Sequence, residues 1–253
     1  MNGQHVTVHA PHPPELRDKP GAWTDLALTL PIFVAYHLGV VFLHVRNGSD
    51  IITGALLRLA ENNLDRYLLV TCGIGAAFAI FFLVVGRGQA FSFAKFAQVI
   101  VEGVVYAIAM RFGAAYLVGR IFAGQMTEPM SPFVGITMSL GAGFYEELAF
   151  RAILFGGGAR LIIWGVLNEQ MHVIAKSTRL SWRAVFLATG WSIFAAAIFS
   201  AVHYFGPLGE KFTLMSFAFR FFLGMALTLI FATRGFATAV WTHALYDIWV
   251  VLV

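Results

Sequence analysis

The apolar positions of the chain fall into seven long runs that are separated by short polar segments. Each run is close to the roughly 20 residues that a helix needs to cross the hydrocarbon core of a bilayer. The pattern therefore predicts an all-α, polytopic membrane bundle with about seven transmembrane helices. The runs are residues 26–45, 67–85, 97–118, 132–155, 184–203, 214–233 and 236–253.

Two shorter segments modify this architecture. The glycines at 156–158 can break the fourth helix, so that residues 153–166 would add an eighth span. Between the first two runs, residues 51–64 place apolar side chains on one helical face and Arg58, Glu61 and Asn62 on the other. This spacing predicts an amphipathic helix at the membrane interface.

Composition agrees with a membrane protein and argues against nucleic-acid binding. Of the 253 residues, 59% are hydrophobic and 12% are charged, which is too apolar for a soluble domain. The net charge of +4 comes from Lys and Arg in short loops, where membrane orientation explains them. They are more numerous on the side of the N-terminus, so we expect that terminus in the cytoplasm. We also expect the protein to lie in the cell membrane of a prokaryote.

The chain divides into three predicted regions. Residues 1–24 are polar, rich in proline and without hydrophobic period, so they are expected to be a disordered tail. Residues 25–125 hold the first three transmembrane helices, whose role the sequence does not indicate. Residues 126–253 form a C-terminal membrane domain, where the charged residues within apolar runs are concentrated.

The candidate functional residues are ionisable side chains inside the apolar runs of this C-terminal domain. Such groups are costly in a bilayer, so they usually face a protein interior or a wet cavity and mark function. They come from three runs and are Glu146, Glu147, Arg151, His203, His243 and Asp247. Six such groups on three predicted helices indicate a functional site.

Helical spacing predicts two local pairs among these residues. Glu147 and Arg151 are four residues apart and stack on one face, whereas Glu146 is rotated by about 100° from Glu147 and remains available for chemistry. His243 and Asp247 are also four residues apart. Asp247 can therefore hydrogen-bond the imidazole and determine its tautomer.

Three motifs in this order resemble those of the CPBP family, which includes the CAAX prenyl endopeptidases of the Rce1 type and the Abi proteins of bacteria. They are EExxxR at residues 146–151, FxxxH from Phe199 to His203, and HxxxD from His243 to Asp247. The resemblance covers residues 132–253 and implies a glutamate-dependent intramembrane endopeptidase. Residues 126–253 would then be its catalytic membrane domain.

The resemblance also implies a role for each motif residue. Glu146 is similar to the general base that activates water, and Glu147 with Arg151 resembles its supporting pair. His203 resembles the histidine that shares the catalytic water. His243 matches a position that polarises the scissile carbonyl and stabilises its oxyanion.

Asp247, with His243, matches the positions that assist the oxyanion, but it departs from the better-studied pattern of the family, which has Asn at this position. An ionised aspartate cannot donate a hydrogen bond to an oxyanion. It would have to be protonated by burial or act indirectly by orienting His243. We expect orientation, because the four-residue spacing supplies it directly.

Two other functions are compatible with the residues. Glu146, His203 and His243 could form a zinc site with an open position, although the absence of HExxH favours a protease without a cofactor. The alternative class is a transporter, or a noncatalytic membrane protein that binds peptides or confers immunity. Glu102, Arg111 and Arg220 would then extend the ionisable cluster into a path through the membrane.

The expected partners are the lipid bilayer and a membrane-associated protein or peptide substrate. Prenylated C-terminal tails, peptide precursors and C-terminal sorting segments are all compatible with the resemblance. The sequence does not distinguish these three substrate classes.

Overall fold

The computed structural model describes residues 22–48, 50–85, 93–118, 131–168, 181–205 and 209–252. Within these ranges every regular element is a helix, so the all-α prediction is confirmed there. Nearly all of the predicted N-terminal tail lies outside the described residues. The helices are α1 (Ala22–Leu28), α2 (Leu30–Leu43), α3 (Ile51–Leu59), α4 (Leu64–Val85), α5 (Phe93–Val118), α6 (Pro132–Gly141), η1 (Ala142–Gly157), α7 (Gly158–Leu167), α8 (Trp182–Val202), α9 (Leu214–Arg234) and α10 (Phe236–Leu252).

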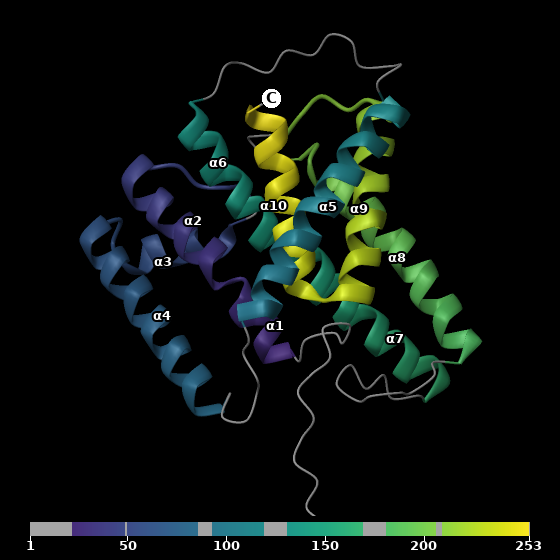
Figure 1. Cartoon of the computed structure of the whole chain (residues 1–253), viewed down its shortest axis with the longest axis horizontal. Helices are drawn as coiled ribbons and strands as arrows, with labels where there is room; N and C mark the ends of the chain where they lie inside the picture. The colour runs from purple at the N-terminus through teal and green to yellow at the C-terminus, as the bar shows by residue number, and fades with distance from the viewer. Residues whose placement is uncertain are drawn as a thin grey trace, which may run out of the picture.

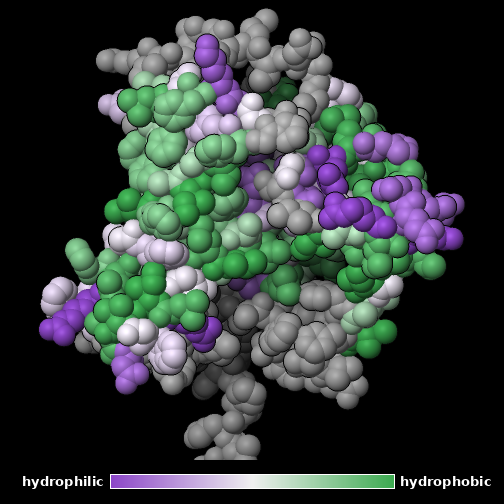
Figure 2. Space-filling model, turned by 180° about the vertical axis from the view of Figure 1, so that it is seen from behind, coloured by the Kyte–Doolittle hydropathy of each residue, from purple (hydrophilic) through white to green (hydrophobic). Residues whose placement is uncertain are grey.

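Four helical stretches are long and apolar enough to cross a bilayer, which marks an integral membrane protein. They are Phe93–Gly113, Pro132–Leu167, Trp182–Val202 and Leu214–Arg234, and two shorter apolar helices are Leu30–Leu43 and Phe236–Leu252. Figure 2 shows apolar side chains over much of the described surface on one face of the molecule, as lipid contact requires. The count of seven or eight spans, the prokaryotic membrane and the cytoplasmic N-terminus stay predictions.

The helical winding continues through the glycines at 156–158, where the sequence allowed a break that would add an eighth span. Gly157 and Gly158 both have right-handed helical backbone angles, so α7 follows η1 without a turn. Element η1 is wound as a π-helix. This winding, with hydrogen bonds between residues five apart, is rare in proteins and occurs frequently at functional sites.

Helix α3 forms within the segment predicted to be amphipathic, but it is shorter than expected. Asp50 caps its start, because Oδ1 accepts a hydrogen bond from the backbone N–H of Thr53 at 2.7 Å. Glu61 and Asn62 have left-handed φ angles of 56° and 57°, so the helix cannot continue to residue 64. Its position at the membrane interface stays a prediction.

Helix α10 occupies the centre of the bundle, where it packs against α5, α6, η1 and α9 (Figure 1). Gly143 of η1 faces α10, and a Cβ atom at this position would lie 2.7 Å from Ala244 Cβ and 2.9 Å from the carbonyl oxygen of Val240. The two helices can approach this closely only because residue 143 has no side chain. This contact brings the first and last sequence motifs together.

The N-terminal helices are joined to η1 by a buried histidine. His37 of α2 lies between two tyrosine hydroxyls, with Nδ1 2.7 Å from that of Tyr67 and Nε2 2.9 Å from that of Tyr145. His37 therefore serves as a helix-packing residue. Because Tyr145 precedes Glu146 in the chain, this contact supports the part of η1 that carries the acidic pair.

Candidate active site

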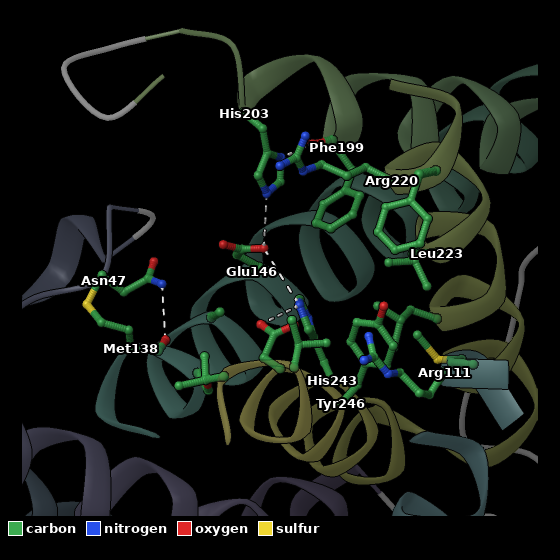
Figure 3. A pocket seen from close by; sticks show the side chains of 18 of the residues that line it. Asn47, Arg111, Met138, Glu146, Phe199, His203, Arg220, Leu223, His243 and Tyr246 are labelled. Carbon is green, nitrogen blue, oxygen red and sulfur yellow. Dashed lines mark hydrogen bonds and ion pairs between the residues drawn. The ribbon is translucent and has the colours of Figure 1, made fainter. Parts of the chain in front are cut away.

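The structure brings the three sequence motifs together at Glu146. Its carboxylate oxygen Oε2 lies 3.9 Å from Nε2 of His203 and 3.9 Å from Nε2 of His243 (Figure 3). Glu146 comes from η1, His203 follows the last residue of α8, and His243 comes from α10. Both separations exceed a direct hydrogen bond. A single water molecule between the carboxylate and an imidazole would span either distance.

The second carboxylate of the acidic pair is buried beside an arginine. Glu147 is 0% exposed and Arg151 is 1% exposed, with Arg151 Nη1 2.9 Å from Glu147 Oε1. The guanidinium also lies 4.1 Å from the centre of the Phe199 ring, a cation–π contact that stabilises a desolvated cation. The predicted pairing of Glu147 with Arg151 is therefore present, and it compensates charge that burial would otherwise disfavour.

Glu147 has a second partner that sequence spacing did not reveal. Its Oε1 lies 2.7 Å from Nδ1 of His243, across the contact between η1 and α10. The predicted contact of His243 with Asp247 is longer, at 3.4 Å between Nε2 and Oδ2. The imidazole therefore has Glu147 on one nitrogen and faces Asp247 and Glu146 with the other.

The orientation of His203 follows from its position at the end of α8. Its Nδ1 lies 2.8 Å from the backbone carbonyl oxygen of Phe199. A carbonyl oxygen only accepts hydrogen bonds, so Nδ1 carries a proton. In the neutral ring Nε2, which faces Glu146, is then the nitrogen with the lone pair.

A cavity of about 440 Å³ contains these groups and lies toward one end of the bundle. Glu146, His203, His243 and Asp247 line it together with apolar side chains such as Leu223. In Figure 1 the C-terminal ends of α5 and α10 and the N-terminal end of α6 lie at the same end of the molecule. The cavity reaches this end, because Gly135 near the start of α6 and Val251 near the end of α10 also line it.

The cavity also includes polar residues that the motif pattern did not assign to the site, among them Asn47, Arg111 and Arg220. Asn47, between α2 and α3, lines it and donates from Nδ2 to the carbonyl oxygen of Met138 at 3.2 Å. Arg111 of α5 and Arg220 of α9 also line it. The two arginines were recognisable as charges within apolar runs, whereas no sequence signal distinguishes Asn47 from other loop asparagines.

The possible zinc ligands do not have zinc-like spacing. A tetrahedral zinc with ligands at its usual distances separates a carboxylate oxygen and an imidazole nitrogen by roughly 3.4 Å, shorter than the 3.9 Å between Glu146 and either histidine. Within the described ranges, no group of three or more His, Cys, Asp or Glu side chains is placed to hold a metal ion. The absence of a metal cofactor stays a prediction.

Comparison with protein families supports the resemblance of the sequence motifs. A model of the type II CAAX prenyl endopeptidase Rce1-like family matches residues 128–249, which include all three motifs. The match confirms the predicted family and supports an intramembrane protease of the CAAX type in general. The comparisons with curated proteins and with solved structures found no match. The division at residues 125 and 126 and the role of each site residue stay predictions.

Proposed function

We propose that the protein is a glutamate-dependent intramembrane endopeptidase, because residues 128–249 match the model of the Rce1-like protease family. It hydrolyses a peptide bond of a membrane-associated protein or peptide. The observation that carries this proposal is the position of Glu146 Oε2, 3.9 Å from Nε2 of both His203 and His243. That arrangement supports a water molecule held between two acceptors, the Glu146 carboxylate and Nε2 of His203, with His243 beside it.

Glu146 activates the water in this mechanism. A water placed between Glu146 and His203 makes one hydrogen bond to each, at about 2.8 Å. Glu146 takes a proton as the water oxygen attacks the carbonyl carbon, which converts the carbonyl oxygen into an oxyanion. The proton then passes to the leaving nitrogen as the C–N bond breaks, and a carboxylic acid and an amine are released.

His243 stabilises the oxyanion. A carboxylate oxygen accepts, so Nδ1 donates to Glu147, and protonation of Nε2 as well gives the ring a second N–H that faces the cavity. The contact of Nε2 with Asp247 is long, at 3.4 Å, and a developing oxyanion nearby would compete for the same proton. Asp247 holds the ring in orientation between turnovers.

Arg151 compensates the negative charge of Glu147 beside Glu146. Two adjacent buried carboxylates repel each other, which favours protonation of one of them. The guanidinium beside Glu147 offsets this repulsion and leaves Glu146 able to act as a base. Arg151 thereby supports catalysis without touching the substrate.

The substrate reaches the site from the end of the bundle near the membrane surface. The cavity extends to Gly135 and Val251, close to the ends of their helices. Prenylated C-terminal tails, peptide precursors and C-terminal sorting segments all present a peptide bond at this depth. The match to the CAAX endopeptidase family favours the first of these classes.

The test is a comparison of the termini of membrane-associated peptides in four kinds of cell. They carry the wild type, Glu146→Gln at matched protein level, or no gene, with Glu61→Gln as a control at an exposed glutamate. Termini present only with the wild type and the control would establish proteolysis through Glu146 and identify the substrate. Termini equal in wild type and Glu146→Gln but changed by deletion would overturn the proposal in favour of a transporter or binding protein.

A further inference from the structure

Arg111 differs from every other arginine of the described ranges in its combination of burial and pairing. Arg46, Arg58, Arg160 and Arg183 are exposed to solvent or lipid. Four others form ion pairs with a glutamate, and they are Arg66, Arg151, Arg220 and Arg234. Arg111 is half-buried, and within the described ranges no carboxylate pairs with it.

A half-buried cation within a membrane helix is unfavourable unless a negative group lies near it. Arg111 belongs to the apolar stretch Phe93–Gly113, and its side chain lines the same cavity as Glu146. Figure 3 shows it beside Tyr246, whose side chain is its polar neighbour from α10. The cavity therefore holds a guanidinium and a phenol hydroxyl that can donate together to one anion.

The chemistry of this pair suits a carboxylate. A guanidinium presents parallel N–H groups that match the two oxygens of a carboxylate, and hydrogen bonds to charged groups are stronger than neutral ones. The other arginine of the cavity already has such a partner, because Arg220 Nη2 lies 2.5 Å from Glu210 Oε1. Arg111 is therefore the arginine of this cavity that is available to bind an anion.

We propose that Arg111, with Tyr246, binds a carboxylate of the substrate close to the scissile bond; the proposal rests on the proposed peptidase function. A compact cavity of about 440 Å³ is roughly 8 Å across, and an extended residue spans about 3.4 Å. The carboxylate therefore lies within a few residues of the cleaved bond. Its source is either the chain terminus or the side chain of an aspartate or glutamate.

The experiment measures binding, so that it does not depend on turnover. The probe is a fluorescent S-farnesylated peptide with a CAAX-type end, added to the protein in lipid nanodiscs in the Glu146→Gln background. Four forms are compared: a free terminal acid, a terminal amide, an amide with Glu within the last three residues, and an amide with Gln in its place. Each is titrated against Glu146→Gln alone and against the same protein with Arg111→Gln, Arg111→Lys or Arg160→Gln.

A carboxylate form should bind about 10- to 100-fold more tightly than its neutral counterpart, as hydrogen bonds to a charged group do. Arg111→Gln should bring this ratio close to one, Arg111→Lys should give an intermediate ratio, and the exposed control Arg160→Gln should retain it. If Arg111→Gln lowers the acid-to-amide ratio, the bound carboxylate is that of the chain terminus. If it lowers the Glu-to-Gln ratio, the bound carboxylate belongs to a side chain.

Ratios that Arg111→Gln leaves unchanged, or binding of none of the four forms, would overturn the proposal. Cleavage by the protein with Glu146 intact is measured separately. Tight carboxylate binding through Arg111 without any cleavage would leave the carboxylate site standing and refute the peptidase function. Cleavage together with ratios that Arg111→Gln leaves unchanged would support the peptidase function and refute the carboxylate site.

Discussion

The imidazole of His243 and the carboxylate of Glu147 are in contact at 2.7 Å, although 96 residues separate them in the chain. Glu147 also pairs with Arg151, so one buried oxygen connects two of the three sequence motifs. The supporting carboxylate of the site therefore has two tasks. It compensates a buried arginine, and it holds the imidazole of a histidine that lines the cavity.

These two tasks separate in variants of Glu147. Glu147→Gln keeps an acceptor oxygen for His243 and should remain folded with reduced kcat. Glu147→Ala leaves Arg151 buried without its partner and should lower the free energy of unfolding by about 3–5 kcal/mol. Thermal unfolding in detergent measures this, with Glu61→Ala as the control for an exposed pair worth about 1 kcal/mol or less. Equal losses of stability in Glu147→Ala and Glu61→Ala would contradict the assignment.

Glu146→Gln and His203→Ala should each abolish cleavage while membrane insertion is retained. The loss of a general base typically lowers the rate by about 10²- to 10⁴-fold, and His203 provides the second contact of the same water. Cleavage of the farnesylated peptide by purified protein measures the rate, and the elution volume of each variant reports its fold. Turnover at the wild-type rate in either variant would refute the water-activating pair.

Asp247 should tolerate an amide but not truncation. Asp247→Asn retains a polar group 3.4 Å from His243 Nε2 and should keep substantial activity, whereas Asp247→Ala should lose tenfold or more, because the ring loses its neighbour in the cavity. The measurement is kcat/KM of both variants on one peptide. If both lost activity equally, the charge or the proton of the carboxylate would be the essential feature rather than orientation.

Gly143→Ala should separate the two helices that carry the site. The added methyl would meet Ala244 and the backbone of Val240, and overpacking of this kind costs about 1–3 kcal/mol. Cleavage should fall together with the unfolding temperature. Gly165→Ala on α7 is the matched control, since a Cβ there has no neighbour within 4 Å, and a similar effect in both variants would show that the η1–α10 contact is not special.

Activity should survive exhaustive chelation, as expected for a water activated by carboxylate and imidazole. The measurement is cleavage after dialysis against a strong chelator, with metal content determined on the same sample. Loss of activity that zinc restores would instead establish Glu146, His203 and His243 as metal ligands, after an adjustment of their 3.9 Å spacing.

The features that could be predicted from the sequence are those that arise within one helix. The pairing of Glu147 with Arg151 and the proximity of His243 to Asp247 follow from residues four apart on a helical face. The apolar runs predicted the helices themselves, because spanning backbone must satisfy its hydrogen bonds internally. The order of the motifs was sufficient to indicate the family that the comparison confirmed.

Glycine is ambiguous in a sequence pattern, because it occurs both at helix ends and within helices. The glycines at 156–158 allowed a helix end in the sequence pattern, but the winding passes through them and Gly158 begins α7. Glycine breaks helices only weakly, at about 1 kcal/mol relative to alanine, and neighbouring packing overrides that preference. In this segment the packing neighbour is Trp191 of α8, whose indole nitrogen donates to the carbonyl oxygen of Leu154 at 2.8 Å.

The helical class, the membrane environment and the identities of the ionisable residues could be inferred from the sequence, because periodicity and burial cost act on each segment separately. The contact of Glu147 with His243, the contact of His37 with Tyr145, and the position of Arg111 and Asn47 at the cavity are seen only in the folded structure. Those contacts depend on how closely helices approach one another. Small residues at helix contacts, such as Gly143, allow this close approach. The spacing of residues along the chain does not reveal which of them lie at such contacts.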